Sequence, residues 1–93
     1  MRPAYGVIGQ VYGRVQGVGF RYFVRTNALA HKLDGWVVNQ DDGSVEVCLV
    51  GSKEQVSIMQ KVVEEGPDAS NVTSVSWQPL NDELDQIKGF SIG

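Results

Sequence analysis

Residues 13–21 read Gly13-Arg14-Val15-Gln16-Gly17-Val18-Gly19-Phe20-Arg21, and across them an apolar strand pattern gives way to a helical one. No Ser, Thr, Asp or Asn precedes this helix, although these side chains usually accept hydrogen bonds from the free N–H groups of a first turn. Arg21 adds a cation beside the positive end of the helix dipole, at a cost of about 0.3–1 kcal/mol. A bound anion removes both difficulties, so the stretch predicts a phosphate or carboxylate site.

The glycines of this loop allow positive φ angles, which let successive backbone N–H groups converge on one anion. The expected phosphate-binding residues are Gln16, Gly17, Val18, Gly19 and Phe20 through their N–H groups, and Arg21 through its charged fork of donors. The alternative is a glycine-rich turn followed by a solvated arginine. The second helix favours the anion, because Ser52 and Gln55 form a capping box there and show that this chain caps a helix that needs no ligand.

Before this loop, residues 5–15 have a strand pattern. After it, apolar residues at helical spacing predict a helix from Phe20 to about Lys32. Leu33-Asp34-Gly35 is expected to close this helix and turn the chain. Further on, Asp41-Asp42-Gly43 between two apolar runs is a strong hairpin signal. Two adjacent acids there favour a solvated turn over a metal site, and no zinc or calcium spacing is present, so we expect no metal.

The remaining elements complete a recognisable order. The expected segments are strands over residues 36–40, 44–50, 72–77 and 90–92, a helix from Ser52 to Gly66-Pro67, and a loop over residues 81–86. This order predicts an α+β fold, a ferredoxin-like β-α-β-β-α-β plait in which an antiparallel sheet carries both helices on one face. The first and third strands are expected at the centre of the sheet. The fold hosts many functions and does not decide among them.

Length and composition limit the class of protein. The chain has 93 residues, 42% of them apolar and 20% charged, which predicts a single soluble domain over residues 1–93. No apolar run approaches the roughly 18 residues that span a membrane, and a net charge of −3 gives no basic footprint for nucleic acid. The start, Met1 to Tyr5, shows no signal peptide, and the single cysteine excludes an internal disulfide, so we expect a cytoplasmic protein. We also expect a monomer.

Three further residues are candidates for chemistry. Asn39 ends the second strand, where its amide is either part of the turn or a neutral ligand. His31 lies near the end of the first helix without an evident Ser, Cys or carboxylate partner, which favours a surface residue. Cys48 shares strand parity with Glu46, which indicates the sheet face opposite the core, and nothing indicates a reactive thiol.

Two segments resemble the signatures of the acylphosphatase family. The first is the stretch from Gly13 to Arg21, and the second is Gly35-Trp36-Val37-Val38-Asn39 followed by Asp42-Gly43-Ser44-Val45-Glu46-Val47. The resemblance runs from about Tyr5 to Ile92. It implies the same plait fold, Arg21 as the ligand of the substrate phosphate, and Asn39 as the residue that positions the attacking water. The implied reaction is hydrolysis of the carboxyl–phosphate bond of acyl phosphates to carboxylate and inorganic phosphate.

This reaction suits the candidate residues. An acyl phosphate has a good carboxylate leaving group, so positioning and charge stabilisation suffice, and no metal or cofactor is expected. In the absence of a clear general base, a substrate oxygen is expected to accept the proton of the water. Two alternatives stay open: a plait that binds phosphate or carbamoyl phosphate without turnover, and an RNA-binding plait. The segment from Gly17 to Phe23 faintly resembles an aromatic RNA-binding motif, but that motif belongs on a strand and here precedes a helix.

Overall fold

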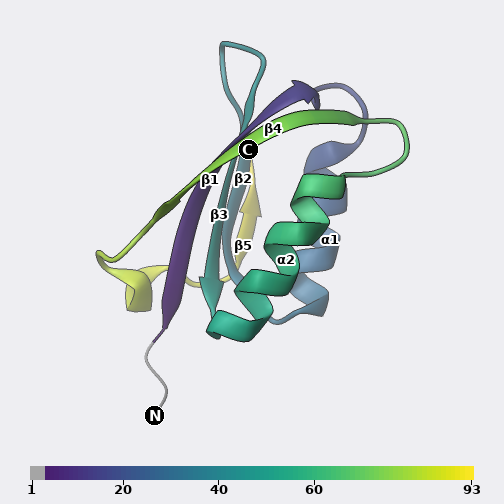
Figure 1. The fold of residues 1–93 in the computed structure, drawn as a ribbon. Helices are drawn as coiled ribbons and strands as arrows, with labels where there is room; N and C mark the ends of the chain where they lie inside the picture. Colours follow the sequence, from purple (N-terminus) through teal and green to yellow (C-terminus); the bar gives the residue numbers. More distant parts are fainter. Residues whose placement is uncertain (1–3) are drawn as a thin grey trace.

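The computed structural model describes residues 4–93, which form one five-stranded sheet with two α-helices packed against it (Figure 1). Met1–Pro3 lie outside the described residues. The expectation about a signal peptide rests partly on these three residues. No helix within residues 4–93 is long and apolar enough to cross a membrane. The elements, in chain order, are β1 (Tyr5–Arg14), α1 (Phe20–Ala30), β2 (Asp34–Asn39), β3 (Val45–Gly51), α2 (Lys53–Glu65), β4 (Asn71–Pro79), the 3₁₀-helix η1 (Leu84–Gln86) and β5 (Phe90–Ile92).

The sheet has the order β4-β1-β3-β2-β5, so β1 and β3 are neighbours in its interior, as predicted. Its first four strands pair antiparallel: Val11 of β1 lies opposite Val45 of β3, and Val37 of β2 lies opposite Val47 of β3. Strand β5 runs parallel to β2, with Val37 opposite Ile92. The ferredoxin-like α+β plait is thus confirmed, and the short last strand, which the sequence pattern did not orient, makes the sheet mixed.

The core lies between one face of the sheet and the inner faces of α1 and α2. It is formed by strand residues of one parity and by the two predicted apolar stripes of the helices. Its buried members on the helices are Phe20, Val24, Ala28, Val56, Met59 and Val63, and on the strands Val7, Val11, Val37, Val45, Val47, Leu49 and Phe90.

Helix α1 ends at Ala30, two residues before the predicted end at Lys32. The chain reverses direction there without a glycine. The backbone N–H groups of Lys32 and Leu33 donate back to the last turn at 3.1 and 2.9 Å, the pattern of a Schellman motif. Lys32 takes the left-handed conformation this motif requires, with φ 58°. The expected turn at Leu33-Asp34-Gly35 is therefore wrong, because Asp34 and Gly35 are the first residues of β2.

The other face of the sheet is partly covered by the connection from β4 to β5, which Figure 1 shows on the side away from α1 and α2. The N–H of Leu80 donates to Gly6 O (3.0 Å), and a Cβ built on Gly6 would meet Leu84 of η1 at 2.7 Å. Cys48 belongs to this face by parity, as predicted, yet it is 0% exposed. Residues 81–86, expected as a plain loop, thus include η1 and cover part of the sheet.

Candidate active site

The loop between β1 and α1 holds two glycines in left-handed conformations. Gly17 has φ 74° and Gly19 has φ 76°, a region in which a residue with a Cβ is strained. A Cβ built on either residue would meet no atom within 4 Å, so these glycines are required by the path of the backbone and not by crowding. The loop sequence predicted this use of glycine.

Apolar side chains around the glycines fix the loop to the core. Val15 and Phe20 are each 1% exposed, and Val18 packs partly buried against the core. Gly19 is the N-cap of α1, and within residues 4–93 no side chain caps that helix. The loop and the first turn therefore present free N–H groups on a rigid support, which suits an anion. They border a cavity of about 150 Å³ that is lined by Val15, Gly17, Gly19, Phe20, Arg21 and Tyr22.

The side chain of Gln16 ties this loop to the β2–β3 hairpin. Its Nε2 donates to Gln40 O at 2.8 Å and to Ser44 O at 2.9 Å. Both protons of the amide nitrogen therefore have partners, and the backbone N–H is what Gln16 has left to offer a phosphate. The sequence grouped Gln16 with the phosphate-binding residues but gave no sign of this second role, because its partners are backbone carbonyls far along the chain.

Arg21 lies in the first turn of α1 and reaches the end of β5. Its Nη1 donates to the backbone oxygen of Gly93, and the N–H of Gly93 donates in turn to Val37 O of β2 at 2.9 Å. One turn further along α1, Arg25 Nε donates to Phe90 O at 3.1 Å. Arg21, a half-buried residue, thus lies where α1 meets the end of β5, and it helps to line the loop cavity.

Asn39, the last residue of β2, is exposed at the same end of the sheet. It shares strand parity with the buried Val37, so its side chain lies on the face of the sheet that carries the helices. The residue after it, Gln40, accepts the hydrogen bond from Gln16. Gly93, which follows β5 and accepts the bond from Arg21, donates its N–H to Val37 O of β2. The fold therefore brings the loop, Arg21 and the end of β2 together from separate parts of the sequence.

The β2–β3 hairpin that carries Asn39 is closed by its own hydrogen bonds. Gln40 N–H donates to Ser44 O at 2.8 Å. The Asp42 carboxylate accepts from Ser44 Oγ (2.6 Å) and Ser44 N–H (2.9 Å), and these two bonds lower the pKa of Asp42. Asp42 therefore has a role in the turn, the interpretation that the sequence favoured. Among the residues from 4 to 93, no group of three or more His, Cys, Asp or Glu could hold a metal ion.

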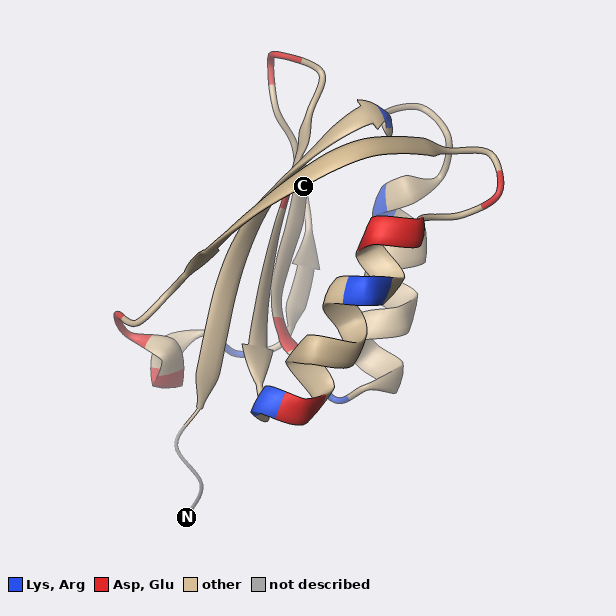
Figure 2. Ribbon diagram, viewed as in Figure 1, with Lys and Arg blue, Asp and Glu red and all other residues tan. Residues whose placement is uncertain are grey.

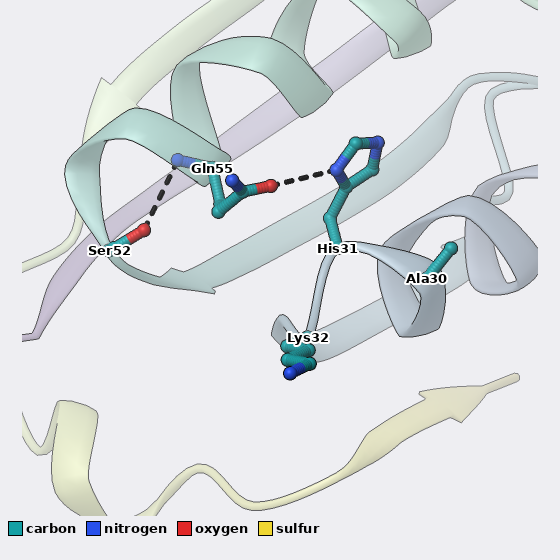
Figure 3. Close-up of a pocket in the computed structure, with 5 residues that line it drawn as sticks. All are labelled: Ala30, His31, Lys32, Ser52 and Gln55. Atoms are coloured by element: carbon teal, nitrogen blue, oxygen red, sulfur yellow. Dashed lines mark hydrogen bonds between the residues drawn. The ribbon is translucent and has the colours of Figure 1, made fainter.

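A larger cavity, of about 420 Å³, lies at the opposite end of α1, next to the start of α2 (Figure 3). There the Nδ1 atom of His31 is 2.8 Å from Gln55 Oε1, and Ser52 Oγ accepts from Gln55 N–H at 3.2 Å. Because the 11 residues of α1 span about 16 Å, this cavity is separate from the loop. His31 has no evident partner in the sequence, which favoured a surface residue, whereas the structure shows it half-buried and hydrogen-bonded to Gln55.

Charges are unevenly placed around the loop. Figure 2 shows basic residues at the end of β1 and in the first turn of α1, and acidic residues at the tip of the β2–β3 hairpin and along the β4–β5 connection. The two basic residues are Arg14 and Arg21. Cations thus flank the loop on both sides, although the whole chain has a net charge of −3.

Known proteins are similar to this chain in both sequence and fold. The Acylphosphatase family model matches residues 7–92. The chain is 48% identical over 82 residues to an acylphosphatase of Bacillus licheniformis, covering 88% of this chain and 90% of that protein. It is 46% identical over 78 residues to one of Bacillus velezensis, covering 84% and 82%. The crystal structure of acylphosphatase from Bacillus subtilis matches with a TM-score of 0.90 at 40% identity, covering 96% and 98% of the two chains. This chain belongs to the acylphosphatase family.

Proposed function

We propose that this chain hydrolyses the carboxyl–phosphate bond of acyl phosphates to carboxylate and inorganic phosphate, without a metal ion, at the β1–α1 loop. Membership of the acylphosphatase family makes it a hydrolase of acyl phosphates. The finer proposal is supported by one observation above all: an uncapped helix start, an arginine and the end of β2 meet at one end of the sheet.

In the proposed mechanism, the N–H groups of Gln16 to Phe20 and the guanidinium of Arg21 bind the phosphate oxygens. These donors are fixed before substrate arrives, so they stabilise the charge of the transition state with little reorganisation. Asn39 orients a water molecule for in-line attack on phosphorus, and the bond from phosphorus to the carboxylate oxygen breaks. A phosphate oxygen of the substrate takes the proton of the water. The carboxylate leaves without a general acid, because it is a good leaving group.

The first test compares two variants by their turnover of an acyl phosphate. For Arg21→Ala we expect kcat/KM to fall by about 10³-fold or more, in line with other arginines that stabilise a transferring phosphoryl group. Arg25→Ala is the matched control, because it also removes an arginine bond from α1 to β5 but lies outside the loop cavity. Near-normal turnover by Arg21→Ala, or an equal loss in Arg25→Ala, would refute the assignment.

Asn39→Ala separates water orientation from phosphate binding. We expect kcat to fall by about 10²-fold, the size expected when a reacting group is misplaced, while inhibition by inorganic phosphate changes little. Loss of phosphate affinity with kcat preserved would instead make Asn39 a phosphate ligand. Activity that a chelator abolishes would contradict the metal-free reaction, and phosphate binding without turnover would favour a binding module.

We further propose that the chain works as a single domain over residues 1–93, as a monomer in the cytoplasm and without nucleic acid or membrane partners. The net charge of −3 and the single cysteine support this setting. Sedimentation in dilute solution tests the monomer, and a salt titration of RNA binding tests the remaining plait alternative.

A further inference from the structure

Tyr22 is an exposed aromatic residue with no structural reason for its position. Its side chain is 70% exposed, against 41% for Tyr12, 47% for Leu29 and 40% for Ile58, the other exposed large apolar residues of the described chain. Tyrosine is not a strong helix former, so the first turn of α1 does not call for it. Single exposed apolar residues are common on protein surfaces, but Tyr22 differs from the others in where it lies. Of the four, only Tyr22 lines the loop cavity.

The loop cavity is small for a whole acyl phosphate. Its volume of about 150 Å³ falls below the roughly 300–1,000 Å³ of pockets that bury most of a larger ligand. The glycines and the first-turn N–H groups that border it suit the phosphate. The acyl group must then extend out of the cavity. Of the residues that line the cavity, Tyr22 is an exposed aromatic residue, next to Arg21 in the chain.

We propose that Tyr22 is the platform on which the acyl group of the substrate packs, so that the site prefers acyl phosphates with an aromatic acyl group over those with a short one. This rests on the proposed function of the loop. A flat acyl group that covers the exposed ring removes apolar surface of both partners from water and makes an aromatic pair. An acetyl group is too small to gain much from such a contact. Tyr22 is then a residue that determines specificity, while Arg21 and the loop bind the common phosphate.

The experiment measures kcat/KM for benzoyl phosphate and for acetyl phosphate in the wild type and three variants. In Tyr22→Ala we expect the value for benzoyl phosphate to fall by about 3- to 10-fold, the range expected for one aromatic contact, and the value for acetyl phosphate to fall less. Tyr22→Phe keeps the ring and should keep the wild-type ratio of the two substrates. Leu29→Ala removes an exposed apolar side chain from the same helix outside the cavity, and should also keep that ratio.

An unchanged ratio in Tyr22→Ala, or an equal drop in Leu29→Ala, would overturn the role of Tyr22 while leaving acyl phosphate hydrolysis intact. If the wild type hydrolyses neither substrate, the proposed function fails, and binding measurements then test whether Tyr22 packs against an aromatic group. Calorimetry then compares phenylphosphonate with inorganic phosphate. A preference for phenylphosphonate that Tyr22→Ala removes supports the platform, and equal affinities in both proteins refute it.

Discussion

At the scale of single residues, Gln16 joins the two halves of the candidate site. Its side chain spans from the β1–α1 loop to Gln40 O and Ser44 O, on the hairpin that begins directly after Asn39. The loop is proposed to hold the phosphate and Asn39 the water, so this side chain sets the distance between the two reacting groups. A bond that fixes geometry affects the transition state more than the binding of phosphate, because small misplacements of reacting groups are costly.

We therefore expect Gln16→Leu to lower kcat by about 10- to 100-fold and to change inhibition by inorganic phosphate much less. The matched control is Gln10→Leu. Gln10 is also a half-buried glutamine near β3, but its amide donates to Glu46 on the other face of the sheet (3.1 Å). Steady-state kinetics with phosphate as the competing inhibitor check the prediction. A Gln16→Leu variant with normal kcat would show that these two side-chain bonds do not set the geometry of the reacting groups, whatever its inhibition by phosphate.

The sequence predicts which residues form the candidate site better than it predicts their contacts. The glycines, the missing cap and Arg21 are local anomalies, so a reader of the sequence can find them without a fold. The partners of Gln16 and of His31 are not local: the acceptors of Gln16 are backbone carbonyls, and Gln55 lies on another helix. No property of Gln16 or His31 alone specifies such a partner, because it depends on how separate elements pack.

At the scale of elements, the predicted ends of α1 and β2 differ from those in the structure, and η1 was not predicted. Lys32 takes the left-handed position at the end of α1 that glycine usually fills, so the sequence lacked the usual stop signal. The sequence pattern predicts a turn at Gly35, yet this residue lies within β2. There a Cβ would collide with the backbone carbonyl of Cys48 on β3, so glycine permits close approach of the two strands. The 3₁₀-helix η1 carries no periodic pattern because it has only three residues.

Lys32→Gly should stabilise the protein. A left-handed conformation costs a residue with a Cβ about 1–2 kcal/mol, and the greater freedom of glycine in the unfolded chain offsets part of the gain. We expect the free energy of unfolding to rise by about 0.5–1 kcal/mol, measured by denaturant titration. Lys61→Gly is the opposite control: Lys61 is an exposed lysine inside α2, where glycine should lower stability by about 1 kcal/mol. Destabilisation by Lys32→Gly would show that the side chain of Lys32 outweighs the strain.

At the scale of the whole molecule, the sheet has two differently covered faces. The helices and the main core lie on one face, and the candidate site lies at one end of this layer. The other face carries a thinner layer, in which the β4–β5 connection covers Gly6 and Cys48 is 0% exposed. Strand parity predicted that Cys48 lies on this face, but the residues that cover the face could not be predicted, because the connection has no regular pattern. Burial and the neighbouring charge of Glu46 raise the pKa of Cys48 to about 12.

Cys48 therefore reports on the covered face independently of the site. The ordinary pKa of a cysteine thiol is 9.0, so a pKa of about 12 in the folded protein leaves roughly 1,000-fold less thiolate at pH 8 than in the unfolded chain. We expect alkylation of the native protein by iodoacetamide to be slower than that of the unfolded protein by at least this factor. Leu84→Ala removes the side chain that lies over Gly6 and should speed the reaction, whereas Gln16→Leu should not. Rapid labelling of the native wild type would show that the β4–β5 connection does not protect this face in solution. Equal acceleration by both variants would show that the thiol reacts only through global unfolding, because a variant far from the covered face could then act only by lowering overall stability.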